Sequence, residues 1–278
     1  MAAGGRNRLM IHHFFFKKNE TNQKKWNVSE RAQILNSKSS FSLVEDYKAI
    51  RANIIFSIPA DGCKLIGITS ADSMEGKSIN CLNQAITFAE TGARVLVMDC
   101  DLRLPKLGRL LAQTSVPGVS NVLVGLSNLT EAIQKTEYKG LDVLLSGTIP
   151  PNPSELLGSA KMKALLEQLK SQYDYILVDT PPINVVSDAL VLSEFLTGVV
   201  IIVRSGVTEK ESVRSAVEQL RFVNATILGF VLNAVPDERS KRYKKYYSKY
   251  DRYYRYGKAQ KPTEENPNQE RVKESQRS

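Results

Sequence analysis

A turn built around Gly76, Lys77 and Ser78 constrains the fold of this chain more than any other feature of its sequence. An apolar, strand-like run at residues 65–69 precedes the turn, and apolar residues at helical spacing follow it as far as Gly92. Such a turn surrounds phosphate oxygens with backbone N–H groups at the N-terminus of a helix. Its lysine reaches the β- and γ-phosphates, and its serine hydroxyl ligates Mg²⁺. The sequence therefore predicts a nucleotide-binding protein.

Two later apolar runs end in aspartate, at Asp99 and Asp101 after the first run and at Asp179 after the second. Ligands of a parallel sheet bind beyond the carboxyl ends of its strands, so we expect these carboxylates to lie beside the phosphate-binding turn. Carboxylates next to phosphates need a counter-charge, and Mg²⁺ is the usual one. Strand-terminal aspartates can also simply cap the next helix or turn. Their combination with the turn favours the nucleotide site, although Ala71 stands where the loose motif has glycine.

Short apolar strands alternate with amphipathic helices over most of the chain. We expect strands near residues 64–69, 95–98, 142–145, 175–178, 198–203 and 227–232, and helices near residues 43–54, 77–91, 154–171, 187–195 and 209–223. Alternation of this kind predicts an α/β fold, in which helices cover both faces of a parallel, P-loop NTPase-like sheet. We expect a flexible leader at residues 1–40, one P-loop domain at residues 41–236 and a disordered tail at residues 237–278.

The composition is that of a globular chain without a membrane span. With 278 residues, 42% of them hydrophobic, the chain can bury one ordinary core. No run approaches the roughly 20 apolar residues of a spanning helix, and the N-terminus lacks the apolar core of a signal peptide. Cys63, Cys81 and Cys100 have no paired spacing and are expected to be small buried residues in a reducing compartment. The sequence thus predicts a cytoplasmic protein with no metal site beyond one for Mg²⁺.

The C-terminal tail is basic and rich in tyrosine. Residues 239–261 carry ten lysine or arginine residues and one acid, so their formal charge equals the +9 of the whole chain. Seven of the chain's 11 tyrosines lie in the tail, at Tyr243, Tyr246, Tyr247, Tyr250, Tyr253, Tyr254 and Tyr256.

Three interpretations fit this tail. A solvated, disordered segment explains the charge but not the tyrosines. Nucleic-acid binding, with lysines on phosphates and rings on bases, is a second interpretation. The third is a cluster of phosphate acceptors, in which each phosphotyrosine adds about −1.5 to −2 charges. We favour the third because the same chain carries a phosphate-handling site, and we do not expect nucleic acid to be a partner.

Taken together, these features resemble the bacterial tyrosine kinases of capsular and exopolysaccharide synthesis, which are P-loop proteins. The resemblance begins near residue 41 and covers most of the chain. It rests on residues 45–53, 75–78 with Asn83, 95–103, 147–157, 179–182, 203–204 and 232–233, and on the tyrosine cluster. The resemblance implies an ATP-dependent tyrosine autokinase that regulates polysaccharide synthesis or export.

The resemblance also implies a role for each site residue. Lys77 and the backbone of residues 73–78 would hold the phosphates of ATP. Asp101 would orient or deprotonate the incoming tyrosine, whose free hydroxyl has a pKa near 10. The full set implied to bind ATP is Ser73, Met74, Glu75, Gly76, Lys77, Ser78, Ile79 and Asn233, with Asn233 facing the adenine. Ser78, Asp99 and Asp179 would hold Mg²⁺, Asp179 directly or through water.

Self-association is implied by Glu45, Lys48 and Arg51, which lie close to one side of a helix. In the family this motif joins subunits into a ring, and the tail of one subunit enters its neighbour's site. The alternative is a solvated helix face. Lys48 replaces the usual middle arginine and loses its bidentate geometry.

A second departure lies in the phosphate-binding turn, where Ser73 and Met74 replace the usual Pro-Gly pair. Since Met74 carries a Cβ, we expect the loop to avoid a glycine-only conformation.

The chain has no attached transmembrane region and so resembles the stand-alone form of the family. That form implies a separate transmembrane adaptor of the polysaccharide co-polymerase type, which recruits the kinase to the inner face of the membrane. A cognate tyrosine phosphatase and other tyrosine-phosphorylated proteins are further implied partners. Two rival functions remain. One is a positioning or partition ATPase, whose signature lysine is replaced here by Asp72. The other is a regulator that binds nucleotide without catalysis.

Overall fold

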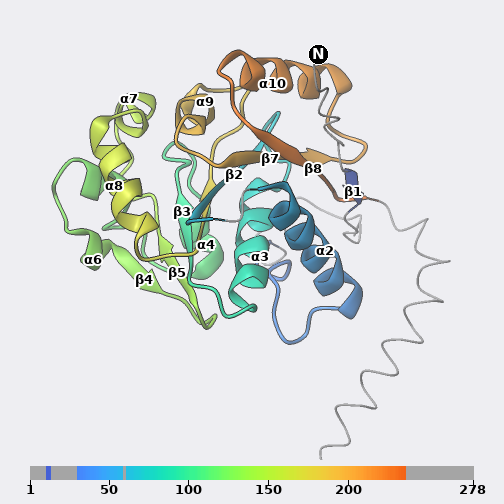
Figure 1. Cartoon of the computed structure of the whole chain (residues 1–278), viewed down its shortest axis with the longest axis horizontal. Coiled ribbons are helices and arrows are strands. Elements are labelled where there is room, and N and C mark those ends of the chain that lie inside the picture. Colours follow the sequence, from blue (N-terminus) through green and yellow to red (C-terminus); the bar gives the residue numbers. More distant parts are fainter. Residues whose placement is uncertain (1–10, 14–29, 59–60, 236–278) are drawn as a thin grey trace, which may run out of the picture. The chain divides into compact units, whose positions relative to one another are not determined.

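An eight-stranded sheet forms the centre of the computed structural model, which describes residues 11–13, 30–58 and 61–235 (Figure 1). The strand order is β1-β8-β7-β2-β6-β3-β5-β4, and every neighbouring pair is parallel except β4 with β5. The strands are β1 (Ile11–His13), β2 (Lys64–Ser70), β3 (Val95–Asp99), β4 (Ile133–Lys135), β5 (Leu141–Leu144), β6 (Tyr175–Asp179), β7 (Gly198–Arg204) and β8 (Ile227–Asn233). This arrangement confirms the predicted α/β fold with a mostly parallel sheet.

Helices cover both faces of this sheet, as predicted. They are α2 (Phe41–Ser57), α3 (Lys77–Ala89), α4 (Leu107–Leu111), α5 (Val119–Leu123), α6 (Leu129–Ala132), α7 (Pro153–Leu157), α8 (Ala160–Lys170), α9 (Asp188–Ser193) and α10 (Lys210–Phe222). The helix expected near 154–171 is divided in two, because Ser159 caps α8 by accepting a hydrogen bond from the N–H of Met162 (3.2 Å). None of the helices in the described residues is long and apolar enough to cross a membrane.

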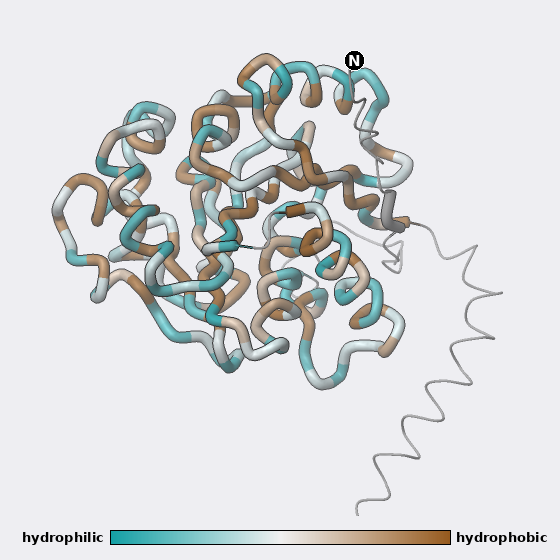
Figure 2. Tube along the Cα trace, in the orientation of Figure 1, coloured by the Kyte–Doolittle hydropathy of each residue, from teal (hydrophilic) through white to brown (hydrophobic). Residues whose placement is uncertain are grey.

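The alternation of side chains along each strand divides the core into two layers. In β3, Val95 and Val97 pack with α2 and α3, whereas Leu96 and Met98 pack with α5 and α8. Hydrophobic residues accordingly run along the central strands (Figure 2). Strands buried on both faces are typical of a parallel sheet.

The register of the central strands explains why the aspartates converge. Asp99 at the end of β3 lies directly opposite Asp179 at the end of β6. On the other side of β6, Asp179 is paired with Ile68 of β2, and β2 leads into the phosphate-binding turn. The pairing of three parallel strands therefore places both aspartates beside the turn.

Part of the expected leader belongs to the sheet and the core. Strand β1 pairs with β8, and Ile34 and Leu35 are buried in the core beneath α2. The N–H of Leu35 donates a hydrogen bond to Asn83 Oδ1 of α3 (2.9 Å). These segments lie before residue 41, which we expected to begin the domain. Residues 1–10 and 14–29 of the leader and the whole tyrosine tail lie outside the described residues.

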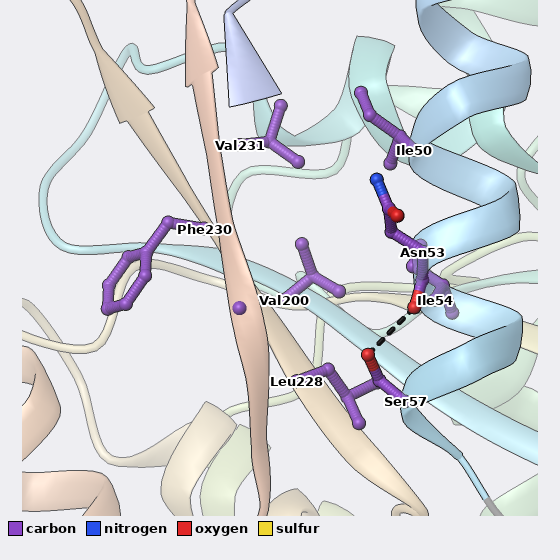
Figure 3. A pocket seen from close by; sticks show the side chains of 9 residues that line it. Ile50, Asn53, Ile54, Ser57, Val200, Leu228, Phe230 and Val231 are labelled. Atoms are coloured by element: carbon purple, nitrogen blue, oxygen red, sulfur yellow. Dashed lines mark hydrogen bonds between the residues drawn. The ribbon is translucent and has the colours of Figure 1, made fainter. Parts of the chain in front are cut away.

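A shallow cavity lies between α2 and the strands β7 and β8 (Figure 3). Ile50, Asn53 and Ile54 of α2 face Val200 and Leu228 of the sheet across it. The Ser57 hydroxyl donates to the carbonyl of Asn53 at its edge (2.7 Å). None of the residues predicted to bind nucleotide lines this cavity. The candidate nucleotide site therefore lies elsewhere.

Candidate nucleotide-binding active site

The phosphate-binding turn connects β2 to α3, and Gly76 is the residue that makes the connection possible. Gly76 has φ +90° at the N-cap of α3, a conformation that favours glycine. A Cβ at this position would also collide with the side-chain amide of Asn233. Both the backbone angle and the close packing therefore require glycine here.

Met74 adopts a left-handed conformation, with φ +65°. A φ of this size favours glycine but is also adopted by other L-residues, so it does not contradict our expectation that the loop avoids a glycine-only conformation. The contacts around the loop explain the conformation of Met74. The Met74 carbonyl accepts a hydrogen bond from Arg204 Nη1 of β7 (2.9 Å), and Lys106 Nζ lies 3.9 Å from its sulfur. Surrounding residues thus hold the loop in a shape that its own sequence disfavours.

This strain gives a first prediction. A left-handed L-residue costs about 1–2 kcal/mol, whereas glycine loses about 0.5–1 kcal/mol more entropy on folding. Replacing Met74 with glycine should therefore raise the free energy of unfolding by up to about 1 kcal/mol, without weakening ATP binding. Ser73→Gly is the matched control because Ser73 has no positive φ, and it should destabilise the protein. Chemical denaturation and an ATP titration measure both effects, and a destabilised Met74→Gly variant would contradict the strain.

Glu75 anchors the turn to the ends of β7 and β8. Its buried carboxylate accepts hydrogen bonds from the Ala71 N–H (3.1 Å) and from the Thr208 hydroxyl. Burial raises the pKa of Glu75, and the hydrogen bond from Thr208 opposes this effect. The Asn233 amide donates to the Glu75 carbonyl (2.8 Å). Asn233, which we expected to face the adenine, therefore also fixes the loop, and its role toward adenine stays a prediction.

Lys77 points from the start of α3 into a group of carboxylates. Its ammonium lies 2.7 Å from Asp101 Oδ2 and 3.6 Å from Asp179 Oδ1. Burial alone would lower the pKa of Lys77, but the charges of Asp179 and Asp101 outweigh it and leave the pKa raised. The lysine therefore stays charged. The structure brings Lys77, Asp101 and Asp179 together as the sequence predicted.

Asp99 and Asp179 are both completely buried. Burial and then the charge of Asp179 raise the pKa of Asp99 well above its usual range. The pKa of Asp179 is also raised by burial, while Lys77 and the nearby Ser78 hydroxyl oppose the shift. Asp99 accepts hydrogen bonds from the N–H groups of Asp101 and Leu107 (3.2 Å each). Two adjacent buried carboxyls with raised pKa values indicate a functional site.

Three buried oxygen atoms at this site have no hydrogen-bond partner. They are the Ser78 hydroxyl oxygen and both carboxylate oxygens of Asp179. Unpaired buried polar atoms are costly, and oxygen atoms are the ligands that Mg²⁺ prefers. In the described part of the chain, no group of three or more His, Cys, Asp or Glu side chains is arranged to hold a metal. A site for Mg²⁺ fits both facts, since Mg²⁺ binds one or two carboxylates together with phosphates and waters.

An ion pair between an exposed arginine and a buried aspartate, which the sequence did not reveal, holds the segment after Asp101. Arg103 donates two hydrogen bonds to Asp188 at the start of α9 (2.9 and 3.0 Å), and Asp188 is completely buried. The Ser154 hydroxyl of α7 also donates to Asp188. Nothing local in the sequence links these positions, which lie 85 residues apart.

Three of the four charged residues of α2 have partners within the same subunit. Glu45 and Lys48 form an ion pair (2.8 Å), each with 38% of its side chain exposed. Arg51 donates to the carbonyl of Thr87 near the end of α3. The structure therefore places these side chains on α2 but does not test their predicted role in association.

Tyr47 links α2 to the phosphate-binding turn, and the sequence analysis missed it. Its hydroxyl is completely buried, accepts from Asn83 Nδ2 (2.9 Å) and donates to Asn80 Oδ1 (3.4 Å). Asn80 Nδ2 in turn donates to the Gly76 carbonyl (2.9 Å). Polar residues on the buried face of α3 were the only available signal of this network.

Asp46 on α2 gives a second prediction, for the dependence of stability on pH. Burial, and then the charge of Glu45, raise the pKa of Asp46 from 3.8 to about 6. As the pH rises from 4 to above 6, the unfolded chain releases this proton first, so the stability of the folded state falls. The side chain is only partly buried, so solvent screening reduces the effect to about 1 kcal/mol.

Asp46→Asn should therefore leave stability unchanged at pH 4 and raise it by about 1 kcal/mol at pH 8. Urea denaturation at the two pH values measures this. The exposed residue Glu90 supplies the control, Glu90→Gln, which should give no such difference. Equal gains in the free energy of unfolding at both pH values would show that ionisation of Asp46 does not cause the gain.

The chain is similar in sequence and in structure to known proteins. A family model described as an AAA domain matches residues 63–227. The chain is 40% identical to the tyrosine-protein kinase YwqD of Bacillus subtilis (strain 168) over 199 residues, which is 72% of this chain and 84% of that protein. It is 34% identical to the putative tyrosine-protein kinase CapB of Staphylococcus aureus over 209 residues, which is 75% of this chain and 92% of that protein. The crystal structure of the chimerical protein CapA2B2 superposes with a TM-score of 0.72 at 34% identity, over 82% of this chain and 95% of that one.

The rival positioning ATPases are structurally more distant. The cell division ATPase MinD of Pyrococcus furiosus superposes with a TM-score of 0.52 at 25% identity, over 61% of this chain and 71% of that chain. In the loop itself, Asp72 accepts a hydrogen bond from Asn184 Nδ2 (3.4 Å), at the position where that class carries its signature lysine. Both observations favour the family of the kinases YwqD and CapB over the positioning ATPases.

Proposed function

The chain belongs to the bacterial tyrosine kinases of capsule and exopolysaccharide synthesis, and from this premise we propose that Lys77 and Asp101 act together in transferring the γ-phosphate of ATP to tail tyrosines. The observation that carries this proposal is the distance of 2.7 Å between the Lys77 ammonium and the Asp101 carboxylate. It places a phosphate-binding cation next to a group that can accept a proton. The ATP-binding tyrosine kinase activity itself follows from the family.

The phosphates are held by the turn and by Lys77 in this proposal. The backbone N–H groups of residues 73–78 and of Ile79 would hold the phosphates at the start of α3, where a helix dipole favours anions. Lys77 then exchanges its contact with Asp101 for contacts with the β- and γ-phosphates. Asn233 fixes the loop through Glu75, and its further role in this proposal is to face the adenine.

Asp101 orients and deprotonates the acceptor tyrosine. Once Lys77 has turned to the phosphates, the Asp101 carboxylate is free to accept the proton of a tyrosine hydroxyl. The free hydroxyl has a pKa near 10, so a positioned base assists its attack on the γ-phosphate. The hydrogen bond from the Leu104 N–H to Asp101 Oδ1 (3.0 Å) keeps the carboxylate in place.

Ser78, Asp99 and Asp179 are the residues we propose to hold Mg²⁺. The side-chain oxygen atoms of Ser78 and Asp179, which make no hydrogen bond, support this assignment. When bound, Mg²⁺ would supply positive charge that offsets the charge developing on the phosphates. Asp99 keeps two backbone hydrogen bonds and holds its carboxylate beside Asp179.

The acceptors in this proposal are the tail tyrosines of a neighbouring subunit in a ring-like homo-oligomer. They are Tyr243, Tyr246, Tyr247, Tyr250, Tyr253, Tyr254 and Tyr256. Residues 239–261 begin with a formal charge of +9. Because each phosphate adds about −1.5 to −2, roughly five or six would neutralise the segment and favour its release from the acidic site.

A separate transmembrane adaptor of the polysaccharide co-polymerase type is the activating partner that we propose, and it would recruit the kinase to the inner face of the cell membrane. The superposition on the CapA2B2 chimera supports an adaptor of the CapA type. A cognate tyrosine phosphatase would reset the tail, and other tyrosine-phosphorylated proteins would be substrates.

Incubation of the pure protein with MgATP, followed by detection of phosphotyrosine, tests the proposal. The measurement is made with and without a cytoplasmic segment of the adaptor. ATP binding without transfer would indicate a regulator, and hydrolysis without phosphotyrosine would indicate a positioning switch. Mixing a Lys77→Met chain with a chain lacking residues 240–258 tests transfer between subunits. The Lys77→Met chain should become labelled, and its failure to do so while wild type labels itself would show transfer within one chain.

Association through α2 gives a third prediction. Replacing Glu45 and Arg51 with alanine should yield smaller species by light scattering and reduce tail phosphorylation about tenfold, because subunits then meet less often. Glu90→Ala serves as the control for loss of an exposed acid. An unchanged mass would show that these residues form a solvated helix face.

A further inference from the structure

Five exposed apolar side chains lie at the carboxyl edge of the sheet. Each is on the loop after a different parallel strand, and between 58 and 72% of each residue is exposed. They are Val207 after β7, Met74 after β2, Val185 after β6, Leu104 after β3 and Ile149 after β5. In the sheet these strands are consecutive neighbours, in the order β7-β2-β6-β3-β5. We call this set the apolar rim.

Direct contacts join the loops that carry the rim. Arg204 and Thr208 of the β7 loop bond to Met74 and Glu75 of the phosphate-binding turn. Asn184, next to Val185, donates to Asp72 of the same turn (3.4 Å).

The remaining two loops are connected in the same way. Lys106 of the β3 loop lies 3.9 Å from the Met74 sulfur. Arg103, next to Leu104, donates to the Ser154 hydroxyl (3.1 Å), beyond Ile149 along the chain. The rim therefore follows the strand ends at which Lys77 and Asp101 meet.

Charge alone does not explain how a basic tail would be selected at this edge. Lys106 and Arg204 lie at the turn, and Arg103 lies on the next loop. The carboxylates of Asp99, Asp101 and Asp179 are buried behind them. A segment with ten lysine or arginine residues meets cations at the entrance, so another attraction must contribute. Apolar contact is the attraction that the rim offers.

The tail has aromatic rings at a spacing that suits this surface. Each of its seven tyrosines has another tyrosine within three residues. Three extended residues span about 10 Å, and five adjacent strands span about 19 Å. A ring three residues from an acceptor at the centre of the rim therefore reaches either end of it.

We propose that the apolar rim binds aromatic side chains flanking the acceptor tyrosine, in the tyrosine-rich segment of a second copy of this chain. The rim thereby makes the kinase specific for clustered tyrosines. This inference rests on the proposed function, because it assigns a substrate class to the same site. The rim residues determine specificity and take no part in the chemical step.

Two synthetic peptides covering residues 247–256 provide the test. Both keep Tyr250 as the single acceptor and carry alanine at positions 254 and 256. One peptide has phenylalanine in place of Tyr247 and Tyr253, and the other has alanine there. Phenylalanine keeps the ring but cannot be phosphorylated. The wild-type enzyme should show a KM for the phenylalanine peptide about three- to tenfold below that for the alanine peptide.

The triple variant Leu104→Ser, Ile149→Ser, Val185→Ser should abolish this preference and leave the KM for ATP unchanged. Phe222→Ser is the matched control. Phe222 is 88% exposed and ends α10 just before β8 begins, at the opposite edge of the sheet. This control should keep the preference. Equal KM values for the two peptides in the wild type, or a preference that survives in the triple variant, would overturn the proposal.

Binding of the same peptides, labelled with fluorescein and measured by anisotropy with ADP present, separates this inference from the proposed function. Tighter binding of the phenylalanine peptide than of the alanine peptide, without phosphotransfer to either, would support the role of the rim. The same result would overturn the assignment of the site as a kinase site. A triple variant that keeps the preference but no longer responds to the adaptor segment would assign the surface to the adaptor and overturn the proposal.

Discussion

Replacing Lys77 with methionine is expected to reduce tyrosine autophosphorylation by about a thousandfold or more. In the proposed site the Lys77 ammonium stabilises the charge that builds up on the transferred phosphate, and the loss of one such preorganised group costs about 10²–10³ in rate. Weaker binding of ATP adds to this loss when the nucleotide is not saturating. Quantitative phosphotyrosine detection at a subsaturating MgATP concentration measures both effects together.

The same substitution should also weaken the fold. Lys77 is the cation that lies within 4 Å of Asp101 and Asp179, and its removal leaves buried carboxylates without a partner. Breaking a buried pair in this way costs about 3 kcal/mol or more. Burial raises the pKa of Asp179, so the loss should be smaller at low pH, where this carboxyl is more often neutral, and urea denaturation at pH 5 and pH 8 measures the difference.

Lys161→Met is the matched control for this prediction. Lys161 is an exposed residue of α8, and its replacement should change neither activity nor stability. A Lys77→Met chain that folds normally and keeps more than a tenth of the wild-type labelling would contradict the assignment of Lys77.

Replacing Asp101 with asparagine should lower kcat by about 10²–10⁴, because a general base typically contributes that factor. Binding of MgATP should change by less than about threefold, since Lys77 contacts the phosphates and not Asp101 once the nucleotide is bound. Asparagine can still accept the hydrogen bond from the Leu104 N–H, so the local backbone should keep its shape. Single-turnover kinetics and a nucleotide titration separate the two quantities.

Asp72→Asn is the control for a lost carboxylate at the same edge of the sheet. Asp72 bonds to Asn184 and makes no ion pair with Lys77. Its replacement should keep kcat close to that of the wild type. Equal losses of kcat in the Asp72 and Asp101 variants would show that the effect comes from removing a negative charge near the site, and not from the loss of proton transfer.

The sequence by itself determined the fold class and predicted which residues lie together at the proposed site, because their signals are local. Hydrophobic periodicity identifies each long strand and helix, and the turn with Lys77 and the aspartates after β3 and β6 lie next to those elements along the chain. In a parallel sheet, strand direction alone then places all of them at one edge. The short strands β1 and β4 were not predicted, since three residues carry no periodic signal.

Only the tertiary structure decided how distant residues support that site. The pairing of β3 with β6 sets Asp99 opposite Asp179 in the interior of the sheet, where burial raises the pKa of both carboxyls. The link from Arg103 to Asp188 joins positions far apart in the chain, and the left-handed conformation of Met74 is held by Arg204 from another strand. These features depend on contacts between elements, whose energies exceed local preferences and leave no pattern in neighbouring residues.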